Sequence, residues 1–155
     1  MYLETERCVI CKFEPENATE LYKVLSDPKV MQYIEPAFDM DKTIQFITEY
    51  GLCEHPLVYA LKWRQTDEVA GHVIFHPYDE NGFEIGWVLG QEYWGKGIAD
   101  EVTKALMRYS KSITKTLVIE CDERQEISRH IALKNGFEYE SKTDGIVVYR
   151  LKLQQ

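Results

Sequence analysis

The chain has 155 residues and a formal net charge of −8 at pH 7, from 18 lysines and arginines against 26 aspartates and glutamates. Its mass of 18.2 kDa and 45% hydrophobic content predict one globular domain over residues 1–155. The acidic pI near 5.0 argues against nucleic acid or an anionic membrane as a partner. The chain opens without a signal-peptide pattern and has no apolar run near the ~18 residues of a membrane span, so a cytoplasmic protein is expected.

Cys8 and Cys11 match the C-x-x-C spacing of redox and zinc sites. Both lie in an apolar run that predicts a strand, where residues three apart point to opposite faces and cannot share a metal. The other cysteines, Cys53 and Cys121, complete no tetrahedral ligand set. We therefore expect reduced, structural cysteines and no metal site.

The first part of the chain predicts one strand followed by two helices. The strand covers residues 8–13, and apolar residues recur at helical spacing after Pro15. Asp27 is a favourable N-cap for a second, short helix that Pro28 opens and Pro36 stops. The helices therefore follow the first strand with little chain between them.

A third helix is expected over residues 41–50. Its apolar residues Ile44, Ile47 and Tyr50 share one helical face, which is expected to be buried. Gly51 follows directly and is a typical C-terminal cap. The helical part of the chain is therefore expected to end at this glycine.

The middle of the chain predicts an antiparallel β-meander. Its strands are expected over residues 57–63, 69–75 and 83–89. Asn81 and Gly82 supply the Asn-Gly signal of a tight hairpin between the last two strands. Gly71 and Gly86 stand inside strands, where glycine indicates a bulge or a close backbone approach.

The last third alternates helices and strands. Helices are expected over residues 97–110 and 124–135, and strands over residues 116–121, 137–141 and 146–151. Gly136 ends the second of these helices, and Asp144-Gly145 turns the final hairpin. The order predicts an α+β fold with a single mixed, mostly antiparallel sheet flanked by helices.

The run from Leu89 to Ala99 joins a strand to an amphipathic helix through closely spaced glycines. Such a loop directs backbone N–H groups at an anion, and the helix adds the positive end of its dipole, so a phosphate cradle is expected. Walker A is disfavoured because Lys96 is followed by Gly97 instead of a serine or threonine. A dinucleotide fingerprint requires glycine where Asp100 stands. Another nucleotide-binding module remains an alternative.

The segment Trp94–Ala99 resembles the coenzyme A pyrophosphate loop of GCN5-related N-acetyltransferases (GNAT), with Gly97 and Ala99 at the two small positions of Gln/Arg-x-x-Gly-x-Gly/Ala. Trp94 departs from the usual first residue, and the whole run is similar to the RimJ/RimL-like branch. Further fragments match in the family's order: Thr5–Arg7, Leu25–Met31, Glu84–Trp87 and Ser128–Phe137. The resemblance therefore covers nearly the whole chain.

The resemblance implies a GNAT-like acyl-CoA N-acyltransferase fold and an acetyltransferase that uses acetyl-CoA as cosubstrate and needs no metal. The acceptor would be a primary amine of a protein N-terminus or a small molecule. The acyl-pantetheine arm would pair with the strand backbone at Trp87, Val88 and Leu89. The pyrophosphate loop would consist of Trp94, Gly95, Lys96, Gly97, Ile98 and Ala99.

The implied reaction is attack of the amine on the thioester carbonyl. Glu84 is the candidate for accepting the ammonium proton through water, and its alternative is a solvated strand position. A backbone N–H at residues 88–89 would stabilise the oxyanion. Ser128 is the candidate for a hydrogen bond to the departing thiolate, and its alternative is a bond to its own helix.

Two departures from the family pattern leave a second function open. Many relatives carry a tyrosine, proposed to protonate the thiolate, where this chain has Ala132, and Gln125 replaces an asparagine. The alternative is an acyl-CoA-binding sensor or interaction module without transferase activity. A monomer and a homodimer are equally compatible with the sequence.

The acceptor side is expected along residues 33–46, where Glu35, Asp39 and Asp41 are mixed with aromatic residues. Acidic and aromatic walls suit a cationic amine. His72 and His76 are expected on one face of a strand, with a structural or substrate-lining role favoured over a metal pair because no third ligand accompanies them. The sequence leaves the identity of the amine open.

Overall fold

Eight strands form the sheet in the computed structural model, which describes residues 1–154. They are β1 (Leu3–Glu4), β2 (Cys8–Cys11), β3 (Val58–Trp63), β4 (Val69–Asp79), β5 (Gly82–Leu89), β6 (Thr116–Asp122), β7 (Glu138–Thr143) and β8 (Ile146–Lys152). Their order is β1-β2-β3-β4-β5-β6-β8-β7, and neighbours are antiparallel except β5 and β6, which are parallel. The predicted α+β class with a mixed, mostly antiparallel sheet is confirmed.

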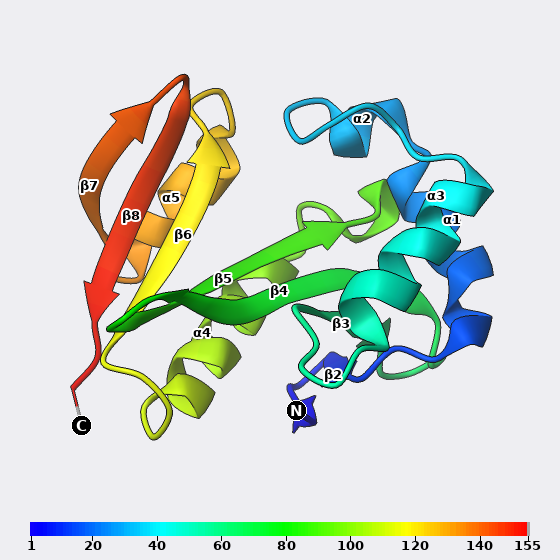
Figure 1. Cartoon of the computed structure of the whole chain (residues 1–155), viewed down its shortest axis with the longest axis horizontal. Coiled ribbons are helices and arrows are strands. Elements are labelled where there is room, and N and C mark those ends of the chain that lie inside the picture. Colours follow the sequence, from blue (N-terminus) through cyan, green and yellow to red (C-terminus); the bar gives the residue numbers. More distant parts are fainter. Residues whose placement is uncertain (155) are drawn as a thin grey trace.

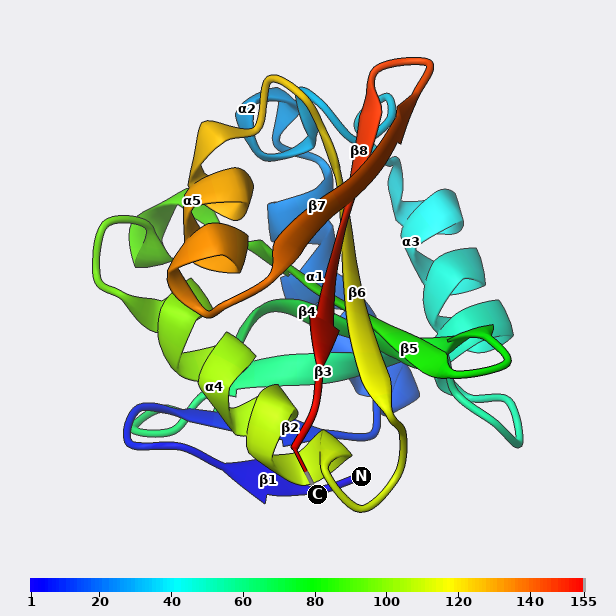
Figure 2. The same ribbon diagram turned by 90° about the vertical axis from the view of Figure 1, so that its left-hand side faces the viewer.

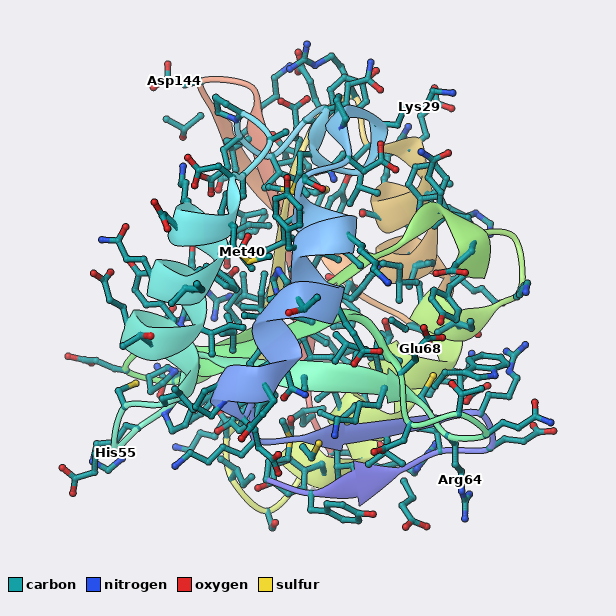
Figure 3. The ribbon with its side chains drawn as sticks, turned by 90° about the vertical axis from the view of Figure 1, so that its right-hand side faces the viewer. Lys29, Met40, His55, Arg64, Glu68 and Asp144 are labelled. Carbon is teal, nitrogen blue, oxygen red and sulfur yellow. The ribbon has the colours of Figure 1, made fainter. Side chains whose placement is uncertain are left out.

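Helices cover both faces of this sheet (Figures 1 and 2). They are η1 (Pro15–Asn17), α1 (Ala18–Leu25), α2 (Pro28–Met31), α3 (Met40–Phe46), η2 (Ile47–Gly51), η3 (Gln91–Tyr93), α4 (Ile98–Ser110) and α5 (Glu126–Lys134). Figure 2 shows α4 and α5 on one side of the sheet and α3 on the other. Figure 3 views the face where α1 and α3 pack, with Met40 at the start of α3.

The two faces have separate hydrophobic cores, and β3 contributes to both. Tyr59 and Leu61 pack in the core under α4 and α5, whereas Val58 and Ala60 pack in the core under α1. Successive side chains on a strand point to opposite faces, so a strand covered on both sides reads as a continuous apolar run. The burial of Val58–Leu61 thus follows from the two helical layers.

The strands β5 and β6 separate soon after they meet. Their parallel pairing joins Gly82–Glu84 to residues 116–118. Beyond Glu84, β5 stays paired to β4 while β6 is paired to β8 along residues 116–122. Figure 1 shows the two strands diverging toward their C-terminal ends. One edge of the second half of β5 is therefore without a strand partner among the described residues.

The cysteines are arranged as the sequence predicted. Cys8 is buried in the core under α4, and Cys11 packs against the other core, so the two thiols lie on opposite faces of the sheet. Burial raises the pKa of Cys8 and Cys121 to about 11, which keeps both thiols protonated. Residues 1–154 contain no cluster of His, Cys, Asp and Glu suited to a metal, and no helix long and apolar enough to cross a membrane.

The third helix differs from its prediction. It ends as an α-helix at Phe46 and continues as a wider π-helical turn, which rotates the following side chains relative to the predicted face. Ile47 is buried as expected, but Ile44 and Tyr50 are 47% and 41% exposed. The C-cap assignment of Gly51 is wrong: Gly51 lies inside the turn, where a Cβ would approach Phe13 to 2.9 Å.

Several strand limits differ from the prediction, and β2 ends at Cys11 instead of residue 13. The two-residue strand β1 was not predicted, and β4 continues past Phe75 to Asp79. Proline cannot donate a ladder hydrogen bond, so the pairing is irregular at this end of the strand. The ladder accommodates Pro77 with a register shift between Pro77 and Asp79.

Asp100 links the two helices on the α4–α5 face. Its carboxylate accepts a hydrogen bond from Asn135 Nδ2 at 2.8 Å and ion pairs with Lys134 at 3.3 Å and with Lys104 one turn along α4. Burial opposes ionisation of this group, but these donors outweigh it and lower its pKa to about 2. The Asp100 carboxylate therefore favours the folded state while it is charged.

We predict that Asp100→Asn lowers the free energy of unfolding by about 1–2 kcal/mol at pH 7. Because the folded pKa is depressed, the wild-type advantage is complete above the ordinary value of 3.8 and disappears as the pH falls toward 2. Urea unfolding between pH 7 and pH 2.5 measures this difference. A difference that does not change with pH would contradict the assigned role.

Candidate active site

The loop between β5 and α4 is shaped by two glycines in left-handed conformations. Gly95 has φ 73° and Gly97 has φ 78°, a region that strains any residue with a side chain. A Cβ on Gly95 would have no atom within 4 Å, and one on Gly97 would meet Arg7 Nη2 at 3.6 Å. The space in front of the loop is therefore open to a ligand.

The backbone of this loop presents a row of free donors. The first hydrogen bond of the helix runs from the Glu101 N–H to the Gly97 carbonyl at 3.1 Å. Within the described chain, the N–H groups from Gly95 to Asp100 donate no hydrogen bond. Free N–H groups at the positive end of a 13-residue helix form an anion site, so the loop fits the pyrophosphate of coenzyme A.

Arg7 holds this loop in place from the turn between β1 and β2. Its guanidinium donates to the Lys96 carbonyl at 2.6 Å and pairs with Glu101 Oε1 at 2.9 Å. Thr5 Oγ1 and the Arg7 N–H donate to the other carboxylate oxygen of Glu101, at 2.6 and 2.9 Å. Burial opposes ionisation of Glu101, yet these hydrogen bonds hold its pKa below the usual range.

The sequence did not predict the functions of Arg7 and Glu101. The only signal was Thr5-Glu6-Arg7, which matched the family without an assigned role. The contact joins residues 94 positions apart, and local patterning carries no information on such pairs.

The side chains of Trp94 and Lys96, which belong to this loop, contact other protein groups. The Trp94 indole N–H donates to the Leu89 carbonyl at 3.0 Å, which ties the loop to the end of β5. The Lys96 ammonium lies 5.9 Å from the ring centroid of Trp63, and that ring packs on Tyr93 at 5.5 Å. Lys96 is therefore beside the cradle, over an aromatic ring.

The second half of β5 offers its backbone along the free edge. Trp87, Val88 and Leu89 pair with β4 on one side, and β6 has already separated on the other. An extended ligand can add to such an edge as a strand would. A Cβ on Gly71 would lie 1.8 Å from the Val88 carbonyl oxygen, so the predicted close approach at this glycine is confirmed.

A pocket of about 400 Å³ lies on the α1–α3 side of the sheet, next to this edge. Most of its lining is apolar, and its polar side chains are Glu35, His72, His76 and Glu84. The apolar lining is Leu25, Met31, Ile34, Phe38, Phe46, Tyr50, Leu57, Val58, Ile74 and Val88. The histidines share one face of β4, as predicted.

Glu84 faces this pocket from the point where β5 and β6 separate. Its side chain is 16% exposed, and its Oε1 lies 3.7 Å from Nε2 of His76, its cross-strand neighbour. Burial raises the pKa of Glu84, His76 opposes this shift, and Glu120 adds to it. A carboxylate with a raised pKa is a better proton acceptor, so the geometry favours the base over the solvated alternative.

His72 is the most enclosed polar group of the pocket. It is 5% exposed, its ring lies 5.0 Å from the ring of Phe46, and its Nδ1 has no hydrogen-bond partner among residues 1–154. Burial lowers its pKa to about 4, with a smaller opposing effect from the Val73 backbone. His72 is therefore neutral at physiological pH.

Ser128 lies half-buried on α5, and its hydroxyl forms no hydrogen bond within the described part of the chain. The alternative in which it bonds to its own helix is therefore not observed. Gln125 instead accepts a hydrogen bond from the Asp122 N–H at 2.9 Å and braces the turn before α5. Ala132 is fully buried in the core under α4 and α5.

The predicted acidic wall is partly used for folding. Asp39 caps α3 by accepting from the Lys42 N–H at 2.7 Å, and Glu35 pairs with the Lys42 ammonium at 2.9 Å. That ammonium also lies 4.5 Å from the Phe38 ring centroid. The wall is therefore less acidic toward a ligand than its sequence suggests, because Lys42 neutralises one carboxylate.

A second cavity of about 480 Å³ spans the two diverging halves of the sheet. It lies between the segment after α2 and the turn after β6. Across it, the Arg124 guanidinium is 4.6 Å from the Tyr33 ring centroid and is held by two 2.9 Å hydrogen bonds to Asp122. These contacts link the two halves above the point of separation.

We predict that His72 makes the fold sensitive to mild acid. The unfolded chain binds a proton below the ordinary pKa of 6.5, but folded His72 binds one only near 4, so stability falls as the pH drops between these values. Between pH 7 and pH 5, wild type should lose about 1–2 kcal/mol more than His72→Phe in urea unfolding. His55→Phe, in an exposed loop (Figure 3), is the matched control and should lose as much as wild type. Equal losses for wild type and His72→Phe would contradict this.

Comparison with known proteins places this geometry in a family. The profile of the Acetyltransferase (GNAT) domain matches residues 7–138. An uncharacterised N-acetyltransferase of Bacillus licheniformis, p20, is 34% identical over 147 residues, which cover 90% of this chain and 83% of that protein.

Solved structures share the fold. A GNAT-family acetyltransferase from Bacillus anthracis superposes with a TM-score of 0.90 at 24% identity, covering 100% of both chains. RimL, a ribosomal L7/L12 alpha-N-protein acetyltransferase in complex with coenzyme A, superposes with a TM-score of 0.81 at 17% identity, covering 99% of this chain and 98% of RimL. The chain belongs to the GNAT family and is an acetyl-CoA-dependent acetyltransferase.

Proposed function

We propose that this enzyme transfers the acetyl group of acetyl-CoA to a primary amine of a protein N-terminus or small molecule bound in the 400 Å³ pocket. The observation that carries the proposal is the row of free N–H groups from Gly95 to Asp100, next to an unpaired strand edge and a pocket that contains the half-buried carboxylate of Glu84. The row fits a pyrophosphate, the edge fits an extended arm, and the pocket fits an acceptor. The three lie in the order that acetyl transfer needs.

The proposed contacts to the coenzyme use the free backbone groups of the loop and of β5. The pyrophosphate contacts the loop of Trp94, Gly95, Lys96, Gly97, Ile98 and Ala99. The pantetheine arm lies along the backbone of Trp87, Val88 and Leu89. Lys96 needs only a change of side-chain rotamer to leave Trp63 and approach a phosphate.

The proposed chemistry is assigned to three groups. Glu84, with His76 beside it, accepts a proton from the ammonium of the acceptor through water. The free amine then attacks the thioester carbonyl, and a backbone N–H at residues 88–89 stabilises the oxyanion. When the carbon–sulfur bond breaks, the free hydroxyl of Ser128 donates a hydrogen bond to the thiolate.

The alternative function is an acyl-CoA-binding sensor or interaction module. It is supported by Ala132, which supplies no phenol, and by Gln125, whose side chain is engaged in its own turn. We further propose a cytoplasmic protein, monomeric or homodimeric, without a nucleic-acid or membrane partner. The free cysteines and the net charge of −8 support this setting.

We predict that wild-type protein releases free thiol from acetyl-CoA when primary amines are supplied, and that Glu84→Gln lowers this turnover by about 10²–10⁴-fold at pH 7. The affinity for acetyl-CoA should be unchanged, and the loss should shrink at higher pH because the amine is then deprotonated before it binds. Glu80→Gln, in the exposed β4–β5 turn, is the control. Binding of acetyl-CoA without any turnover across the amine panel would favour the sensor.

The cradle gives a separate prediction. Arg7→Met removes the contacts to the Lys96 carbonyl and Glu101, so acetyl-CoA should bind about tenfold more weakly by isothermal titration calorimetry. Arg64→Met is the matched control, because Arg64 contacts Thr5 and Glu4 at the sheet edge (Figure 3) and not the loop. Equal affinities for the two variants would refute the supporting role of Arg7.

A further inference from the structure

The pocket contains a polar group that the proposed reaction does not use. His72 is buried beside Phe46, lines the pocket, and has an Nδ1 without a hydrogen-bond partner in the described chain. A buried polar atom without a partner destabilises a protein by about 1–3 kcal/mol, and a ligand that supplies the partner regains part of this free energy. The Nδ1 atom is itself enclosed, so a ligand in the pocket meets the ring at its other nitrogen, Nε2, which has no side-chain or backbone hydrogen bond within residues 1–154 either.

The two polar ends of the pocket are separated along the strands. Glu84 is paired with His76, whereas His72 is paired with Val88. The Cα atoms of His72 and His76 are about 13 Å apart on an extended strand, with the apolar Ile74 between them. An acceptor whose amine lies at Glu84 can thus reach His72 only through an apolar spacer.

The chemistry of His72 selects the group at the far end. A neutral imidazole offers one N–H and one lone pair, and a hydroxyl can donate to one or accept from the other. A second ammonium would be desolvated there with no carboxylate opposite, since Glu84 lies at the other end and Glu35 is paired with Lys42. A methyl group would leave the imidazole unpaired.

Resting on the proposed function, we propose that the acceptor is an amino alcohol: a primary amine, an apolar spacer, and a neutral hydroxyl that hydrogen-bonds to His72. The same pattern is met by an aliphatic amino alcohol and by a hydroxylated aromatic amine. Phe46, Ile74 and Val88 contact the spacer. His72 is then a specificity-determining residue, and Glu84 acts at the amine.

Three probes with equal numbers of heavy atoms test this specificity: 6-amino-1-hexanol, heptylamine and 1,6-diaminohexane. The measurement is kcat/KM for thiol release from acetyl-CoA with each probe. For wild type, the amino alcohol should exceed both of the other probes. In His72→Phe, the ratio of amino alcohol to heptylamine should fall by about tenfold or more, because the hydroxyl loses its partner.

Two further variants separate hydrogen bonding from shape. His72→Gln retains a donor and an acceptor and should restore part of the ratio. His55→Phe makes the same exchange at an exposed position outside the pocket and should leave the ratio as in wild type. Because each ratio compares two probes on one protein, a variant of reduced stability or rate still reports specificity.

The outcomes distinguish this inference from the proposed function. Thiol release with heptylamine but no advantage for the amino alcohol, or an advantage that survives in His72→Phe, overturns the role of His72 and leaves the transferase standing. If wild type turns over none of the probes, the transferase proposal fails for this class. The affinities of the same probes for the coenzyme A-bound protein are then measured by calorimetry. The ratio of the affinity for the amino alcohol to that for heptylamine, compared between wild type and His72→Phe, decides the role of His72.

Discussion

The separation of β5 from β6 is the constraint on which the rest of the structure depends. Parallel pairing stops at Glu84, which leaves the backbone of Trp87–Leu89 with a free edge inside the fold. An unpaired edge is a liability that proteins normally cover. Here β6 is paired with β8 instead, and the link between Tyr33 and Arg124 spans the gap above. The edge is therefore kept available for a ligand that adds as a strand would.

Two carboxylates lie at the start of α4, next to this edge, and both are neutralised by neighbouring groups. Asp100 and Glu101 stand in the first turn, where carboxylates favour the helix but repel a phosphate. Asp100 is bound by Lys104, Lys134 and Asn135, and Glu101 by Arg7 and Thr5. These partners neutralise both charges and anchor the helix to α5 and to the turn between β1 and β2. The free N–H groups before them can then attract an anion.

The two histidines of β4 have different surroundings. His76 is partly exposed and lies beside Glu84, where it opposes the rise in the pKa of that carboxyl. His72 is enclosed by Phe46 and stays neutral because burial disfavours its charged form. The pocket therefore has the neutral imidazole of His72 at one end and the carboxylate of Glu84 at the other.

The sequence by itself determined the local elements, the class of the sheet and the anion loop, because strand and helix periods and closely spaced glycines are read from neighbouring residues. It failed at Gly51, where a π-turn packed against Phe13 replaces a cap. Only the tertiary structure decided that Arg7 supports the loop, that Glu84 is half-buried at the point of strand separation, and that Nδ1 of His72 has no hydrogen-bond partner among residues 1–154. Each depends on contacts between distant segments or on desolvation, and both arise only when the chain has folded.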